Sequence, residues 1–186
     1  MVKIIPKTTK LLELLAAKNS SIYKTMSLYY KRLVRKEATL ANIQPTDKVL
    51  CIGGGPCPIS GILLHEYTKA HVTIIDNDEH CVRISRDLIQ RLGYEDSIKI
   101  IYGDGNDISP ENYNVIHMAV QVSPLDQVFC KLKQKCPFGA KILVRLPKKN
   151  LTNFYSVNDF SIFHNCCRKA VHHRRNIEST ALFIKT

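Results

Sequence analysis

Residues 53–58 read Gly-Gly-Gly-Pro-Cys-Pro, so a stretch of three flexible glycines is followed at once by two prolines that stiffen the chain. Residues 48–53 are apolar enough for a buried strand, and the helical pattern resumes at Ile59. Glycines let backbone N–H groups approach a ligand because no Cβ intervenes, and a helix that begins just beyond adds unpaired donors. Gly53, Gly54, Gly55 and Pro56 are therefore predicted to form a nucleotide cradle.

A second apolar segment, residues 71–76, ends in Asp76. In a βαβ unit that binds a dinucleotide, the acid that binds the ribose lies about 20 residues beyond the glycine loop. Asp76, with Asn77 beside it, matches that position, whereas Asp78 suits the N-cap of the next helix. The cradle and Asp76 together predict an adenosine cofactor.

The rest of the chain alternates strands with helices. Two helices are expected before residue 46, and Gly93 is expected to end a later helix that begins near Glu79. The tail reads as a β-hairpin around a polar corner at residues 172–176. The fold class is therefore α/β, a doubly wound and mostly parallel seven-stranded sheet. We expect a helical extension at residues 1–46 and a Rossmann-like cofactor domain at residues 47–186. The expected strands cover residues 48–53, 71–76, 97–102, 115–120, 140–146, 160–171 and 180–184.

This order of elements resembles the class I S-adenosylmethionine-dependent methyltransferase fold. The loop departs from the usual G-x-G-x-G pattern, since Cys51 stands where an acid is common and Cys57 where the third glycine is common. With its two prolines it resembles more closely the G-x-G-P-x-P-x-T/S loop of nicotianamine synthases and their small prokaryotic relatives. The resemblance covers roughly residues 29–185 and implies S-adenosylmethionine as the cofactor.

The resemblance also assigns roles to residues after the third and fourth strands. Asp104, followed by Gly105, matches the position at which an acid meets the adenine amino group. Val120 and Gln121 follow the strand that lines the methionine end of the cofactor in related proteins. The fourth strand lacks an Asn-Pro-Pro-Tyr motif, which disfavours the common adenine-N6 methylation of nucleic acids.

One acid outside the cradle, Glu37, lies on an apolar helical stripe together with Tyr30 and Leu33. Burial against the sheet would raise the pKa of Glu37, which could then take a proton from a substrate amine. Nicotianamine synthases carry a similar Tyr…Leu…Glu helix before the loop, so the resemblance implies catalytic roles for Tyr30 and Glu37. The alternative is an ion pair between Glu37 and a Lys or Arg.

The formal net charge of +11 is unevenly distributed. Residues 1–48 carry ten basic and three acidic side chains, residues 49–128 carry five and eleven, and residues 129–186 carry twelve and two. The acidic middle suits a cationic cofactor, and the basic ends suit an anionic acceptor or nucleic acid. Solvated lysines that only aid solubility are the alternative.

Cysteine usage and the start of the chain indicate the compartment. The seven cysteines share no regular spacing, which favours reduced thiols. The first ten residues lack the apolar block of a secretory signal, and no apolar run is long enough to span a membrane. We expect a cytoplasmic protein that does not bind membranes. A metal site is not predicted, because the adjacent pairs 166–167 and 172–173 would point in opposite directions on a strand.

Two functions follow from these patterns. The first is an enzyme, an S-adenosylmethionine-dependent transferase that moves a methyl or 3-amino-3-carboxypropyl group to a small acceptor, an amine in the case that resembles nicotianamine synthase. Plant nicotianamine synthases enclose their substrate with a larger N-terminal domain, so either the substrate is small or a second copy, in a homodimer, closes the site. The second is an RNA methyltransferase or a cofactor-sensing RNA-binding protein, suggested by basic residues that include Arg174 and Arg175.

Overall fold

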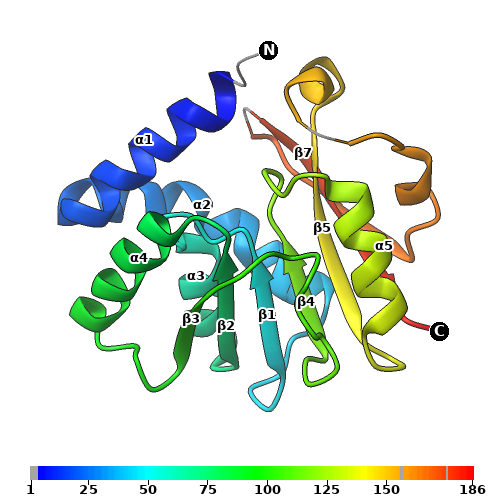
Figure 1. The fold of residues 1–186 in the computed structure, drawn as a ribbon, viewed down its shortest axis with the longest axis horizontal. Coiled ribbons are helices and arrows are strands. Elements are labelled where there is room, and N and C mark those ends of the chain that lie inside the picture. The colour runs from blue at the N-terminus through cyan, green and yellow to red at the C-terminus, as the bar shows by residue number, and fades with distance from the viewer. Residues whose placement is uncertain (1–3, 156, 175) are drawn as a thin grey trace.

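The computed structural model describes residues 4–155, 157–174 and 176–186, so Arg175 lies outside the described residues. Its centre is a seven-stranded sheet in the order β3-β2-β1-β4-β5-β7-β6 (Figure 1). Strands β1 to β5 pair in parallel, whereas β7 pairs antiparallel with both β5 and β6. This sheet confirms the predicted α/β class. The strands are β1 (Lys48–Ile52), β2 (His71–Asp76), β3 (Ile98–Tyr102), β4 (Val115–Met118), β5 (Lys141–Pro147), β6 (Arg168–Val171) and β7 (Ile177–Ile184).

Helices cover both faces of the sheet. Alternate residues of β1 enter different apolar clusters, as the two-residue period of a strand requires: Val49 and Cys51 join one cluster, and Leu50 and Ile52 join the other. The first cluster includes side chains of α1 to α4, and the second includes side chains of α5, which lies in front of the sheet in Figure 1. The helices are α1 (Ile4–Lys18), α2 (Ser20–Leu40), α3 (Ile59–Thr68), α4 (Glu79–Leu92) and α5 (Leu125–Lys135), with short 3-10 helices η1 (Lys149–Phe154) and η2 (Ser161–Phe163).

Local capping signals define the ends of α2 and α4. Asn19 accepts hydrogen bonds from the backbone N–H groups of Ser21 and Ile22 at the start of α2. Asp78 caps α4 in the same way, as predicted, and Gly93 ends it with a left-handed conformation at φ 71°. No described helix combines the length and the apolar character that crossing a bilayer requires.

The tail differs from the predicted hairpin in both strands, because β7 begins at Ile177 rather than at residue 180 and the first strand is much shorter. The strand predicted over residues 160–171 occupies only Arg168–Val171, and Ser161–Phe163 forms the 3-10 helix η2. Phe160 and Phe163 pack against each other with ring centroids 6.5 Å apart, and Phe163 also packs against Phe129 at 5.2 Å. A strand would send residues three apart to opposite faces. A helical turn places both rings on one apolar surface, which is why the longer strand does not form.

Candidate functional site

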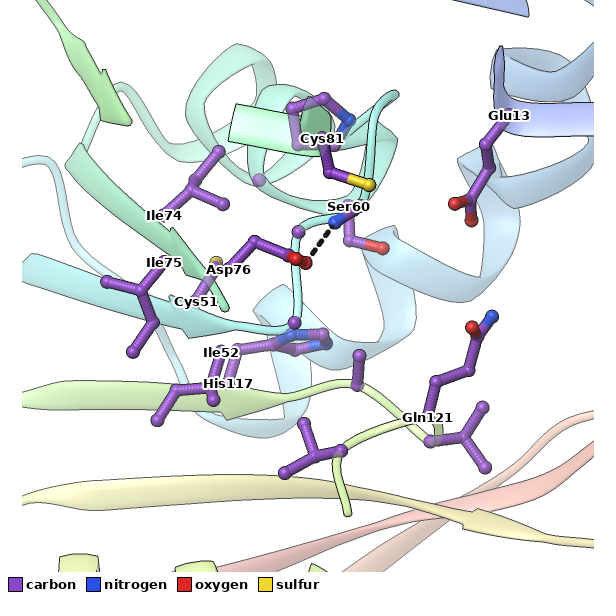
Figure 2. Close-up of a pocket in the computed structure, with 18 of the residues that line it drawn as sticks. Glu13, Cys51, Ile52, Ser60, Ile74, Ile75, Asp76, Cys81, His117 and Gln121 are labelled. Atoms are coloured by element: carbon purple, nitrogen blue, oxygen red, sulfur yellow. Dashed lines mark hydrogen bonds between the residues drawn. The ribbon is translucent and has the colours of Figure 1, made fainter. Parts of the chain in front are cut away.

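A cavity of about 310 Å³ opens at the carboxyl ends of the central strands (Figure 2). Strand β1 lies between β2 and β4, so the chain order reverses there and the loops after these strands diverge. Open α/β sheets bind ligands at this kind of switch point. The cavity is lined by those loops together with Lys10 and Glu13 of α1 and Met26 and Tyr30 of α2.

The residues that the sequence assigns to the cofactor meet in this cavity. All ten line it, as does Tyr30, whereas Glu37 is not among the lining residues. They come from the end of β2 and from the loops after β1, β2, β3 and β4, which are brought together by the parallel order of those strands. The ten residues are Gly53, Gly54, Gly55, Pro56, Asp76, Asn77, Asp104, Gly105, Val120 and Gln121.

Backbone hydrogen bonds hold the glycine loop against β2. The N–H groups of Gly53 and Gly54 both donate to the carbonyl of Ile75, at 3.0 and 3.1 Å. A Cβ on Gly54 would overlap Ile74, and a Cβ on Gly55, whose φ is 64°, would lie 2.6 Å from Oε2 of Glu13. The loop therefore requires glycine at both positions.

Asp76 joins this loop to the second strand. Its Oδ2 accepts the Gly55 N–H at 2.7 Å, drawn as a dashed line in Figure 2, and its Oδ1 accepts the Asp78 N–H at 3.0 Å. A carboxylate has about four acceptor positions. These two bonds use about half of the acceptor positions of Asp76. The other half remain available to a ligand in the cavity.

Asp104 is fixed by its own turn. Its Oδ1 accepts hydrogen bonds from the backbone N–H of Asn106 at 2.8 Å and from the side-chain amide of Asn106 at 3.0 Å. The backbone bond is the main cause of a pKa below the usual range for this carboxyl. Asp104 is therefore an ionised acceptor at neutral pH, and its Oδ2 takes part in neither of these bonds.

Glu13 is a lining residue that the sequence reasoning missed. Its carboxylate points from α1 toward the glycine loop in Figure 2 and is partly buried. Burial, and then the negative charge of Asp76, raise the pKa of Glu13 to about 8. Glu13 is the first acid in the chain and is flanked by leucines, which is the signal that could have identified it. A carboxyl with this pKa exchanges its proton near neutral pH.

Glu37 lies behind the cavity in a buried ion pair. Arg145 of β5 donates from Nε to Oε1 at 2.8 Å and from Nη2 to Oε2 at 2.7 Å. Thr180 Oγ1 donates to Oε1 at 2.6 Å, and His117 Nε2 lies 3.3 Å from Oε2. The expected rise in the pKa of Glu37 is wrong: burial acts upward, but Arg145 and His117 outweigh it and lower the pKa. Four contacts fill the acceptor positions of this ionised carboxylate.

The other side of Arg145 faces the cavity. Its Nη1 donates to Ser60 Oγ at 2.8 Å at the start of α3, and its guanidinium carbon lies 5.9 Å from the ring centroid of Tyr30. Burial is the main cause that raises the pKa of Tyr30 to about 12, so its hydroxyl stays protonated at neutral pH. His117, at the cavity floor, has a lowered pKa, first because it is buried and then because of Arg145.

The electrostatic character of the cavity is acidic. Glu13, Asp76 and Asp104 line it, whereas Lys10 is paired with Asp78 and Arg145 with Glu37. A ligand with a positive charge therefore fits this lining better than an anion. Among the residues that the structure describes, no group of three His, Cys, Asp or Glu side chains is arranged to hold a metal ion.

Sequence comparison gives one short match. No protein-family model matches the chain. The L-histidine 2-aminobutanoyltransferase of Yersinia pestis is 31% identical over 72 residues, which are 39% of this chain and 27% of that protein. The match thus spans only about a quarter of the length of this curated relative.

Solved structures match nearly the whole chain. The crystal structure of MtNAS, a nicotianamine synthase, in complex with MTA and tNA has a TM-score of 0.81 at 22% identity, over 96% of this chain and 71% of that chain. A mutant of MtNAS in complex with S-adenosylmethionine has a TM-score of 0.78 at 22% identity, over 96% and 74%. An RNA methyltransferase from Salinibacter ruber, in complex with S-adenosyl-L-homocysteine, has a TM-score of 0.65 at 15% identity, over 83% and 90%.

These likenesses define the class of fold. The chain has the class I S-adenosylmethionine-dependent methyltransferase fold, as its sequence resemblance implied. Within that class, its arrangement is similar to that of the nicotianamine synthase structure over almost its full length.

Proposed function

We propose that the chain is an S-adenosylmethionine-dependent transferase that acts on a small nucleophilic acceptor. The observation that carries this proposal is the single cavity in which the glycine cradle, Asp76, Asp104 and Glu13 meet. Its acidic lining suits a sulfonium cation, and the site occupies the switch point of the sheet. The proposal includes a cytoplasmic location.

The residues present fit this cofactor. A Cβ at Gly54 would collide with Ile74, and one at Gly55 would lie against the Glu13 carboxylate, so glycine at both positions lets the loop backbone lie close to β2 and to α1 at the cavity wall. The free acceptor positions of Asp76 would take the two ribose hydroxyls, and Asp104 would accept from the adenine amino group. Val120 and Gln121 would border the methionine end.

S-adenosylmethionine supplies a carbon bonded to a positively charged sulfur, from which a neutral thioether departs with the electron pair of the broken S–C bond. Glu13, ionised by the positive charge of the bound cofactor, would take the proton that an amine acceptor loses as its nitrogen gains the carbon. The protonated Tyr30 hydroxyl would donate to the acceptor and orient it. Holding the reactants in line can contribute roughly 7 to 11 kcal/mol.

Glu37 has a different role in this proposal from the proton transfer inferred from sequence. Its carboxylate is fully buried, ionised and saturated with hydrogen bonds, so it has no free position for a proton from the acceptor. We assign to it the positioning of Arg145 and His117, which face the cavity. Tyr30 remains a proposed catalytic residue because it lines the cavity itself.

Transfer of the 3-amino-3-carboxypropyl group is the more specific form of the proposal. The curated relative is named for transfer of a 2-aminobutanoyl group to L-histidine, and the fold is similar to that of MtNAS over 96% of this chain. Both support an amine acceptor, and methyl transfer is the alternative. That a homodimer closes the site stays a prediction, which sedimentation velocity would check.

Calorimetric titration with S-adenosylmethionine tests the cofactor assignment. Asp76→Ala removes both the proposed ribose contacts and the bond to the Gly55 N–H, so we expect binding to weaken by at least about 100-fold. Asp96→Ala removes an exposed carboxylate and serves as the matched control. Equal affinity of the wild type and Asp76→Ala would overturn the assignment of the cradle.

A further inference from the structure

Basic side chains gather on the face formed by α2, β6 and the segment after β5. Helix α2 packs against β6, and Lys36 Nζ donates to the carbonyl of Val171 at 3.2 Å across this contact. Residues 20–36 and 160–177 contain no aspartate or glutamate. We call this face the basic surface, and its members are Lys31, Arg32, Arg35, Lys36, Lys148, Lys149, Arg168 and Arg174.

A wide, shallow depression of about 740 Å³, called the groove below, lies on the basic surface. Lys148, Lys149, His173 and Arg174 line the groove, and Glu178 is the one acid among its lining residues. A concave site with an excess of positive charge attracts anions and excludes cations.

An aromatic ring holds one of these cations in place. The guanidinium carbon of Arg174 lies 4.4 Å from the ring centroid of Tyr29, whose side chain is partly exposed. Tyr29 in turn meets Tyr30 edge to face at 5.1 Å, and Tyr30 lines the cofactor cavity. An ordered guanidinium plane beside an aromatic ring is the kind of platform on which nucleic-acid bases stack.

The groove borders the cofactor cavity. Asn176 and Ile177 line the cavity, and Glu178, the next residue of β7, lines the groove. On the neighbouring strand, Arg145 faces the cavity, and Lys148, just beyond the end of β5, faces the groove. A strand that lies in the groove would therefore pass the rim of the cavity.

We infer that the basic surface binds single-stranded nucleic acid through its phosphates, with the groove at Lys148 and Lys149 as the centre of the contact. Phosphate groups repeat along such a strand, so several lysines and arginines of the surface can each pair with one. The bases remain free to stack. This inference does not rest on the proposed group transfer, because none of the cations in the groove belongs to the cofactor cavity.

Fluorescence anisotropy with a labelled 20-nucleotide RNA at several salt concentrations tests the inference. The slope of the logarithm of the binding constant against the logarithm of the salt concentration should be smaller in magnitude by about 1.4 in the double variant Lys148→Ala/Lys149→Ala. This change weakens binding about 25-fold at 0.1 M salt. The control is Lys131→Ala/Lys135→Ala, which removes the same charge from exposed positions on α5, across the sheet. The control should bind like the wild type.

Other outcomes would overturn the inference. These are no binding by the wild type at low salt, equal loss in the control variant, or tighter binding to vesicles that contain phosphatidylserine than to RNA. Binding of the duplex form as tightly as the single strand would contradict the stacking role of the groove. Calorimetry with S-adenosylmethionine separates this result from the proposed function, since the Lys148→Ala/Lys149→Ala variant should keep the wild-type affinity for the cofactor.

Discussion

The protonation of Glu13 should make the affinity for the proposed cofactor depend on pH. Its pKa of about 8 arises from burial and from the charge of Asp76, so the carboxyl is mostly protonated at neutral pH when the cavity holds no cation. A cation in the cavity favours the ionised form. Binding of S-adenosylmethionine should therefore release a proton from Glu13, and the Glu13→Gln variant should release none.

The size of the effect follows from the pKa. The free energy needed to ionise Glu13 rises by about 1.4 kcal/mol for each pH unit below its pKa. At pH 6 this free energy is therefore about 2.7 kcal/mol. The dissociation constant should fall about tenfold from pH 6 to pH 7 and change by no more than about twofold above pH 8. Close to one proton per chain should leave Glu13 on binding at pH 6.

Isothermal titration calorimetry in buffers of different ionisation enthalpy measures both quantities. The titratable groups of the cofactor contribute equally in the wild type and in Glu13→Gln, so the difference between the two isolates Glu13. The Glu95→Gln variant, changed at an exposed site on the turn after α4, controls for the loss of a surface charge. A pH profile in Glu13→Gln that is as steep as in the wild type would refute the reasoning. So would proton release that is unchanged by the substitution.

Two further substitutions, and the thermal stability of Glu13→Gln, test other parts of the structure. Gly54→Ala places a methyl group against Ile74, so cofactor binding should be lost by calorimetry while the circular dichroism spectrum is kept; wild-type affinity would contradict the tight cradle. Glu37→Ala leaves Arg145 buried and unpaired and should lower the free energy of unfolding by about 3 to 5 kcal/mol in urea, whereas a loss below about 1 kcal/mol would contradict the buried ion pair. The folded state raises the pKa of Glu13 above its ordinary 4.5, so the wild type loses stability as pH rises from 4.5 through about 8. Glu13→Gln should therefore melt higher than the wild type at pH 8 and equally below about pH 4, and a difference of the opposite sign would exclude this cause.

The sequence predicts those parts of the fold whose signals are local. The bounds of β2 and α4 follow from an apolar run, the cap at Asp78 and the left-handed Gly93. That the proposed cofactor residues lie together could be predicted because each one ends or follows a strand, and parallel strands bring their carboxyl ends to one edge. The prediction of a strand at Phe163 was wrong because the apolar residues there fit a strand as well as a helical turn. Only the packing of Phe163 on Phe129 decides between the two.

The candidate site depends on contacts between distant segments, which the sequence does not show. The apolar stripe places Glu37 in the core, but its partner Arg145 is 108 residues away, and their pairing reverses the expected direction of the pKa shift. Glu13 reaches the glycine loop only because α1 packs across the mouth of the cavity, where Lys10 pairs with Asp78. Neither contact has a periodicity or a spacing that would reveal it.

The central claim is group transfer from S-adenosylmethionine to an amine, and the products test it most directly. The chain would be incubated with S-adenosylmethionine and a panel of amino acids that includes L-histidine, and the nucleoside products would be separated by mass. The proposal predicts that methylthioadenosine accumulates with wild-type protein and much more slowly with Glu13→Gln. S-adenosylhomocysteine in its place would show methyl transfer and contradict the aminocarboxypropyl assignment, and the absence of both products across the panel would contradict the claim.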